Sequence, residues 1–398
     1  MRPSVSRRLA LRHLPLALAL SPALVAPPPV EAAGAKVTLK AADGVELAAT
    51  HFPAAKPGPG VVLLHMCNSD RSAWNGLGEK LAAAGIHAVA LDYRGYGESG
   101  GVRHRDPAEQ QRNIDANWPG DVDAALAFLA AQEGVDATRI GAAGGSCGVS
   151  QAVHLARRHP DRVRTLVLLA GNANRAGEEF LAANGWMPLF AAGARDDGNA
   201  DEMMAWLLGF SGNPDNSLKR YETGGHGTEL FAVHAELEPA IVAWFERFLA
   251  REPRSRTDAA PAPPHRPSLE VWLELREPGG AARLRERAAA ARSEGRALPM
   301  PPEGPVNVLG YELSQAGRHD DAIAAFRLNT ELHPDSANTW DSLSDGYLAA
   351  GRREEALAAV RRVLETLPAD PERDREFEKQ LREIATEKLA RLAAPVAD

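Results

Sequence analysis

One serine in this sequence lies in a pattern that is typical of a nucleophile. Residues 144–148 read Gly-Gly-Ser-Cys-Gly, so Ser146 has a glycine two positions before it and another two positions after it. Thr138–Ala143 is typical of a strand that ends at this point, and Val149–Arg158 has the apolar periodicity of a helix. A sharp strand-to-helix turn holds a serine hydroxyl clear of the backbone and directs N–H groups toward a developing oxyanion. The pattern therefore predicts a catalytic serine, and the alternative is a tight turn with a structural role only.

A serine hydroxyl needs a positioned base, and the base needs a carboxylate to orient it. His226 lies between two glycines in a loop, where it has no core face to satisfy, and is predicted to be the general base. Asp196 follows the predicted strand Met187–Ala192 in a turn and is predicted to be the acid, with its neighbour Asp197 as the alternative. His234 falls in the next predicted helix and is expected at the surface.

An oxyanion hole needs two N–H donors. The backbone of Cys147, directly after the serine, is expected to supply one of them. The other is expected from the loop at residues 65–70, with Met66 preferred and Cys67 as second choice. Cys147 itself is a poorer nucleophile candidate than Ser146, because Val149 and not a glycine stands two positions after it.

The chain has two cysteines, Cys67 and Cys147, and this arrangement places both beneath the predicted site. Two interpretations stay open: a disulfide formed in an oxidising compartment, or two small buried thiols.

The elements that must position these residues alternate between short apolar strands and amphipathic helices over residues 36–251, which predicts an α/β domain with a mostly parallel sheet. Strands are expected at Lys36–Lys40, Val45–Phe52, Gly60–His65, Ile86–Leu91, Thr165–Ala170 and Met187–Ala192, besides the strand before Ser146. Helices are expected at Trp74–Ala84, Asp121–Ala131, Met203–Leu208 and His234–Ala250. The segments Gly101–Pro119 and Asn172–Trp186 are expected to be loops that shape an acyl pocket.

Residues 252–267 are proline-rich and charged and are predicted to be a linker to a helical domain at residues 268–398. Gly317-Arg318 recurs as Gly351-Arg352, and apolar, alanine and proline positions recur at the same 34-residue offset. This period predicts tetratricopeptide-like repeats over about residues 305–368, with Glu372–Leu392 as a cap helix.

The composition is that of an ordinary globular protein, with a net charge of −8 and 44% hydrophobic residues, and it favours neither nucleic acid nor an anionic membrane as a partner. At the N-terminus, arginines precede an apolar run at Leu14–Ala26, and small residues follow it. This order predicts a signal peptide over residues 1–35, cleaved near Ala32 or Ala35, and hence a periplasmic or secreted protein. The alternative is a membrane anchor formed by the uncleaved segment.

Several of these motifs together resemble the α/β-hydrolase superfamily. They are His65-Met66-Cys67-Asn68, the run from Leu91 to Ser99, Gly144–Gly148, Gly193–Asp196 and Gly225-His226-Gly227. The resemblance covers about residues 37–250 and implies an eight-stranded sheet with Ser146, Asp196 and His226 as the triad. The compact spacing is similar to dienelactone hydrolases and small esterases. Dienelactone hydrolases often have a cysteine nucleophile, whereas this chain has a serine. The C-terminal repeats resemble a family that binds peptides or partner proteins.

The sequence thus predicts an exported serine hydrolase, carboxylesterase-like, that acts on an ester or related acyl bond of a small-molecule substrate. Peptidase, thioesterase and acyltransferase are alternatives within the same chemistry. No metal or organic cofactor is expected, because no zinc-ligand spacing or phosphate-binding loop occurs. A different class of function is an envelope adaptor, whose repeat domain binds a protein partner and whose hydrolase domain is vestigial.

Overall fold

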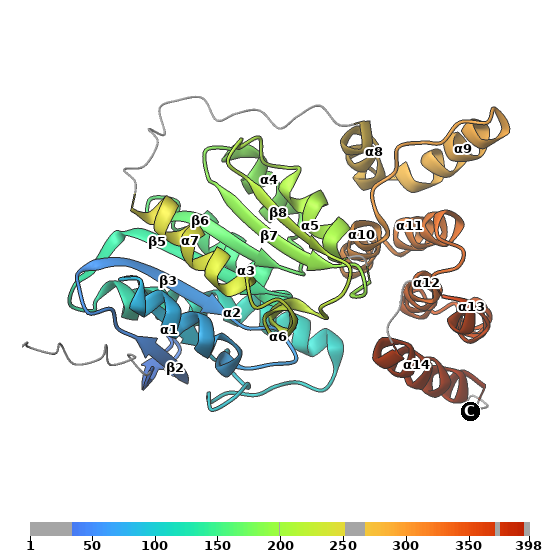
Figure 1. The fold of residues 1–398 in the computed structure, drawn as a ribbon. Helices are drawn as coiled ribbons and strands as arrows, with labels where there is room; N and C mark the ends of the chain where they lie inside the picture. Colours follow the sequence, from blue (N-terminus) through green and yellow to red (C-terminus); the bar gives the residue numbers. More distant parts are fainter. Residues whose placement is uncertain (1–33, 199, 251–266, 371–374, 394–398) are drawn as a thin grey trace, which may run out of the picture. The chain divides into compact units, whose positions relative to one another are not determined.

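The structure is a computed structural model that describes residues 34–198, 200–250, 267–370 and 375–393. Its sheet of eight strands has the order β1-β2-β4-β3-β5-β6-β7-β8 (Figure 1). β1 pairs antiparallel with β2, and β2 antiparallel with β4, whereas all the other neighbouring strands are parallel. The strands are β1 (Ala35–Lys40), β2 (Glu46–Phe52), β3 (Gly58–Leu64), β4 (His87–Leu91), β5 (Val135–Gly145), β6 (Val163–Leu169), β7 (Leu189–Ala194) and β8 (Ser217–Tyr221). The predicted α/β fold class is confirmed.

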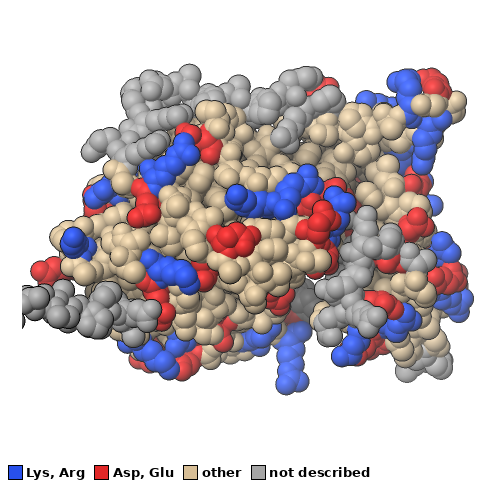
Figure 2. All heavy atoms as spheres, in the orientation of Figure 1, with Lys and Arg blue, Asp and Glu red and all other residues tan. Residues whose placement is uncertain are grey.

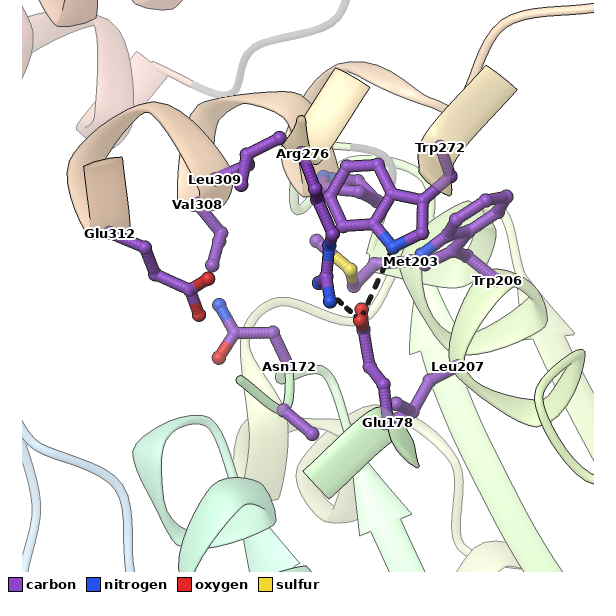
Figure 3. Close-up of a pocket in the computed structure, with 12 residues that line it drawn as sticks. Asn172, Glu178, Met203, Trp206, Leu207, Trp272, Arg276, Val308, Leu309 and Glu312 are labelled. Carbon is purple, nitrogen blue, oxygen red and sulfur yellow. Dashed lines mark hydrogen bonds and ion pairs between the residues drawn. The ribbon is translucent and has the colours of Figure 1, made fainter. Parts of the chain in front are cut away.

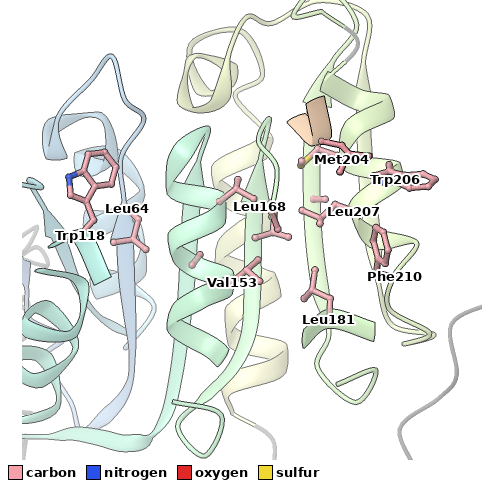
Figure 4. Close-up of a cluster of buried hydrophobic side chains, with 14 of the residues drawn as sticks. Leu64, Trp118, Val153, Leu168, Leu181, Met204, Trp206, Leu207 and Phe210 are labelled. Carbon is pink, nitrogen blue, oxygen red and sulfur yellow. The ribbon is translucent and has the colours of Figure 1, made fainter. Parts of the chain in front are cut away.

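Helices cover both faces of this sheet, because the strands bury side chains on both sides. In β3, Val61 and Leu63 join one apolar cluster while Val62 and Leu64 join the other. The first cluster includes side chains of α1 (Asn75–Ala83) and α7 (Leu237–Leu249). The second includes side chains of α2 (Pro107–Ala130), α3 (Cys147–Arg158), α4 (Arg175–Ala183) and α5 (Ala200–Leu208), part of which Figure 4 shows against β3 and β6. The alternation of apolar residues therefore explains the layered arrangement.

Two segments that were expected to be loops contain helix. α2 begins at Pro107, far earlier than the predicted start, because Asp106 accepts a hydrogen bond from the Glu109 N–H and caps the first turn. α4 lies within the second segment, capped by Asn174, whose side chain accepts from the Gly177 N–H. The expectation of two irregular loops is therefore wrong for most of both segments.

After residue 266 the described chain is helical. The helices are α8 (Pro267–Arg276), α9 (Gly280–Ser293), α10 (Glu303–Gln315), α11 (His319–Leu332), α12 (Ala337–Ala349), α13 (Arg353–Thr366) and α14 (Arg375–Ala393). α10 and α12 each have 13 residues and start 34 apart, and α11 and α13 each have 14 and also start 34 apart. Ala322 and Ala356, at equivalent repeat positions, are fully buried. The 34-residue offset therefore corresponds to two similar helix pairs, while their assignment as tetratricopeptide repeats stays a proposal.

Glu178 of α4 is a buried carboxylate with two donors from α8. It accepts hydrogen bonds from the Trp272 indole and from the Arg276 guanidinium (Figure 3). Burial raises the pKa of Glu178 to about 7, and the charge of Arg276 opposes that rise. The cluster lines a small pocket that contains none of the predicted catalytic residues.

Acidic and basic side chains are interspersed on the face that Figure 2 presents. None of the helices in the described ranges is both long and apolar enough to span a membrane. Residues 1–33 of the predicted signal peptide and residues 252–266 of the predicted linker lie outside the described residues.

Candidate active site

Ser146 lies at the turn between β5 and α3, and its backbone has the strained conformation that such a turn requires. Its φ is 52° and its ψ is −123°, which is uncommon for a residue other than glycine. The chain passes so closely here that a Cβ on Gly144 would lie 2.1 Å from the Gly148 carbonyl oxygen. A Cβ on Gly148 would lie 2.3 Å from the Leu64 carbonyl oxygen. Both flanking glycines are therefore required by packing, and the half-buried serine is held at the carboxyl edge of the sheet.

A chain of two hydrogen bonds connects Ser146 with His226 and with an aspartate. The Nε2 of His226 lies 2.7 Å from the Ser146 Oγ, and its Nδ1 lies 2.7 Å from an Oδ2 of Asp197. With the Nδ1 hydrogen donated to the carboxylate, Nε2 has its lone pair toward the serine hydroxyl. The three side chains therefore have the arrangement in which an imidazole can accept the serine proton.

The structure corrects the choice between the two adjacent aspartates. Asp196 does not contact the imidazole; its carboxylate accepts hydrogen bonds from the N–H groups of Gly224 and Gly225, at 3.0 and 3.4 Å. Adjacent side chains in the turn after β7 point in different directions. Asp197 faces His226, and Asp196 faces Gly224 and Gly225, which precede His226 in the chain. Asp196 thus holds the backbone that carries His226, and Asp197 orients the ring.

The surroundings of His226 favour its protonated form. Burial lowers the pKa of the imidazole, but the hydrogen bond to Asp197, that carboxylate's charge and the charge of Glu229 together raise it above 6.5. Burial raises the pKa of the Asp197 carboxyl, and the hydrogen bond from His226 opposes that effect. The imidazole is therefore a stronger base than a free histidine side chain.

His65 fixes the loop after β3 in one orientation. Its ring is fully buried, and burial lowers the pKa of this imidazole, which favours the neutral form. Nε2 accepts a hydrogen bond from the Tyr93 N–H, so Nδ1 carries the hydrogen and donates it to the Met66 carbonyl oxygen at 2.6 Å. The Ser69 N–H donates to the same oxygen at 3.2 Å. The peptide between Met66 and Cys67 is thus held from its carbonyl side.

These contacts distinguish the two expected donors of that loop. The carbonyl and N–H of a trans peptide point in opposite directions, so the Cys67 N–H points away from the buried His65 ring. The His65 carbonyl oxygen lies toward the elbow, 4.0 Å from the Cys147 sulfur, and the Met66 N–H therefore points away from the elbow. Among the described residues, neither N–H has a hydrogen-bond acceptor. The geometry favours Cys67 over Met66, which reverses the order of preference from the sequence.

Cys67 and Cys147 form a disulfide, with their Cα atoms 5.8 Å apart. The open question of the two cysteines is resolved in favour of the bond, and both residues are half-buried. Cys147 is also the first residue of α3, where the N–H groups of the first turn have no partner within the helix.

Two contacts around the site were missed at the sequence level. The Met66 sulfur accepts a hydrogen bond from the Thr228 N–H at 3.4 Å, which connects the loop after β3 with the loop that carries His226. His234 is not in a helix interior: it ends α6 (Leu230–Val233), stacks on Tyr221 and donates from Nε2 to the Thr223 carbonyl at 2.7 Å. Both are long-range contacts, for which a single sequence carries no signal.

In the described part of the chain, no group of three or more His, Cys, Asp or Glu side chains is arranged to hold a metal ion.

Residues 59–206 match the model of a family described as the alpha/beta hydrolase fold. Together with the strand order, this match confirms the α/β-hydrolase fold that the sequence motifs resemble. Two uncharacterized proteins of Mycobacterium tuberculosis, from strains CDC 1551 and H37Rv, are each 36% identical over 131 residues. The match spans 32% of this chain and 43% of each relative, so less than half the length of these relatives is covered.

Several solved esterases and hydrolases are similar to part of the chain. The esterase Pf2001 of Pyrococcus furiosus has 17% identity and a TM-score of 0.42, covering 54% of this chain and 91% of that one. The dienelactone hydrolase of Anabaena variabilis has 16% identity and a TM-score of 0.42, covering 54% and 98%. Est1E of Butyrivibrio proteoclasticus, solved with ferulic acid, has 15% identity and a TM-score of 0.44, covering 54% and 100%.

Proposed function

We propose that this protein is a serine hydrolase that cleaves an ester or a related acyl bond. The observation that carries the proposal is the hydrogen-bonded series of Ser146, His226 and Asp197 on a strained strand-to-helix turn. The φ of 52° at Ser146 has a cost that a glycine would avoid, which supports a functional role for this serine.

In the proposed mechanism, the Ser146 Oγ attacks the carbonyl carbon as its proton passes to the His226 Nε2. Asp197 keeps the Nδ1 hydrogen in place and stabilises the imidazolium that forms. The tetrahedral intermediate then breaks its bond to the leaving alcohol, which takes the proton from Nε2. Water attacks the resulting acyl-enzyme with the same base, and the carboxylic acid is released while Ser146 regains its proton.

The N–H groups of Cys67 and Cys147 are proposed as the oxyanion-hole donors, in place of the pair Met66 and Cys147. The proposal is supported by the direction of the Cys67 N–H and by the position of Cys147 at the start of α3. N–H groups that are oriented before the reaction stabilise the negative charge without reorganisation, which is the largest contribution in many acyl-transfer enzymes.

Carboxylesterase activity on a small-molecule ester is the proposed reaction. We also propose export to the periplasm or the medium. The predicted signal peptide and the disulfide support it, because disulfides persist in oxidising compartments. N-terminal sequencing of the protein from the periplasmic fraction should give a start just after Ala32 or Ala35, and an intact Met1 would contradict cleavage.

The test of the main proposal is the hydrolysis of p-nitrophenyl acetate by the full-length protein. Ser146→Ala should lower kcat/KM by about 1,000-fold or more, because it removes the nucleophile. Ser150→Ala, four residues along on α3, is the matched control and should retain activity. Turnover that is equal in wild type and Ser146→Ala would contradict the proposal. It would favour the alternative of an adaptor whose repeat helices bind a protein partner.

A further inference from the structure

We propose that the Cys67–Cys147 disulfide positions the two N–H groups of the oxyanion hole, so that the oxidised protein is the fully active one. This inference rests on the proposed function and deepens it. The two cysteines act through their backbone N–H groups, and their bonded sulfurs set the spacing of those groups.

The bond connects the segments that follow two neighbouring strands, β3 and β5. Leu64 of β3 and Gly144 of β5 are paired in the parallel register, and each is the residue three positions before one of the cysteines. The disulfide therefore crosses between two adjacent strand ends at the carboxyl edge of the sheet, where the two proposed donors must converge. The Cα separation of 5.8 Å lies in the usual range for a disulfide.

The two ends of the disulfide differ in how firmly other contacts hold them. Cys147 begins α3, whose apolar residues are buried against the sheet. Cys67 lies in a turn next to the exposed Asn68, and its carbonyl oxygen accepts a hydrogen bond from the exposed Arg103 at 3.1 Å. His65 and Ser69 hold the Met66 carbonyl, and His65 is itself bonded to the Tyr93 N–H, but these hydrogen bonds do not involve the elbow. The disulfide is thus the covalent restraint that ties the Cys67 end to the elbow.

A dithiol can reach this bond, because both cysteines are half-buried and neither is fully enclosed. One thiolate of dithiothreitol attacks a sulfur, the protein S–S bond breaks and a mixed disulfide forms. The second thiol of dithiothreitol then displaces the remaining protein sulfur. Two protein thiols are produced, dithiothreitol becomes its cyclic disulfide, and two electrons and two protons have passed to the protein.

Loss of the restraint should act on the transition state more than on substrate binding. The oxyanion exists only as the tetrahedral species forms, so its donors contribute to kcat and not to ground-state affinity. Since removal of one donor costs about 100-fold to 1,000-fold in kcat, a donor that is merely loosened should cost about 10-fold or more. KM and the pH dependence set by His226 should change little, since the Ser146–His226–Asp197 bonds do not involve either cysteine.

The experiment measures kcat, KM and the pH profile for p-nitrophenyl acetate with the full-length protein in three states: as purified without reductant, after dithiothreitol, and after reoxidation. Thiol titration of the denatured protein follows each state. The expected result is no thiol, then two, then none, with kcat falling about 10-fold or more on reduction and returning on reoxidation. The Cys67→Ala/Cys147→Ala variant should have the low kcat at once and should not respond to dithiothreitol.

A control separates positioning from general stability. Leu249→Ala removes a fully buried side chain at the end of α7, away from the site, and lowers stability without touching the disulfide. Its kcat should stay near that of wild type at temperatures below its unfolding transition, and it should respond to dithiothreitol as wild type does. If reduction unfolds the protein, the double variant, assayed below its own transition, gives the deciding kcat.

Two outcomes would overturn the inference. One is an unchanged kcat in protein that titrates with two thiols, and the other is two free thiols in the protein purified without reductant. Both leave the proposed function standing if the oxidised protein hydrolyses the ester and loses that activity in Ser146→Ala. Absence of Ser146-dependent turnover in the oxidised protein would instead contradict the proposed function.

Discussion

Asp197 lies with its carboxylate 2.7 Å from the Nδ1 of His226, while the carboxylate next to it in the chain, that of Asp196, accepts backbone N–H groups. One turn thus supplies two carboxylates with separate roles. Asp197 acts on the ring of His226, and Asp196 acts on the glycine turn that carries it. Substitutions at these neighbouring positions should therefore have different kinetic effects.

Asp197→Asn should lower kcat/KM by about 1,000-fold to 10,000-fold, because the amide no longer stabilises the imidazolium and can select the wrong tautomer. Asp196→Asn is the matched control, with the same change one residue away. It should cost stability of about 1 kcal/mol through weakened hydrogen bonds to the glycine turn, with a far smaller loss of kcat/KM. Steady-state kinetics on a p-nitrophenyl ester compares the two, and the reverse ranking would show that Asp196 orients the imidazole.

The pH dependence of kcat/KM should reflect the raised pKa of His226. The base must be neutral to accept the serine proton, so activity should rise with pH through a pKa above 6.5. In Asp197→Asn, the residual activity should have its acid limb at lower pH, because burial still lowers the pKa of the imidazole and the carboxylate that raised it is gone. An acid limb that does not move in this variant would contradict the assigned pair.

The close approach at the elbow predicts a large effect of a single methyl group. Gly148→Ala places a Cβ 2.3 Å from the Leu64 carbonyl oxygen, so β3 and α3 must separate, at a cost of about 1–3 kcal/mol or more. Gly120→Ala is the control, since its Cβ meets no atom within 4 Å and alanine favours the α2 helix by about 1 kcal/mol. Thermal unfolding should rank Gly148→Ala below wild type and Gly120→Ala at or above it. Equal transitions for the two variants would contradict the packing described for the elbow.

Phe326 should be a main determinant of the helix pairs α10–α13. It is fully buried in α11, and Phe326→Ala should destabilise these helices by about 3–5 kcal/mol through the lost burial and the cavity. Leu273→Ala, at a side chain that is 58% exposed in α8, should change stability by less than about 0.5 kcal/mol. In Phe326→Ala, hydrogen exchange should be faster than in wild type for peptides from α10–α13 and unchanged for peptides from β5–β6. Unaltered exchange there would contradict the packing.

The parts that the sequence predicted well are those with local signals. The α/β fold class follows from alternating strands and helices, and the Gly-x-Ser-x-Gly spacing predicts the turn at Ser146. The choice between Asp196 and Asp197 could not be predicted, because it depends on how the turn after β7 orients two adjacent side chains toward a loop some thirty residues later. The preference between Met66 and Cys67 likewise depends on the direction of a peptide that the buried His65 ring determines. The helix α4 was not predicted, although three alanines and two glutamates among its nine residues favour a helix and only its glycine does not.

The central claim is that Ser146 is an activated nucleophile, and a fluorophosphonate probe followed by peptide mapping tests it most directly. Wild type should form one covalent adduct, mapped to Ser146. Ser146→Ala should form none, and His226→Ala should react far more slowly, because the serine proton has lost its acceptor. No adduct in folded, oxidised wild type, or an adduct on a residue other than Ser146, would contradict the account.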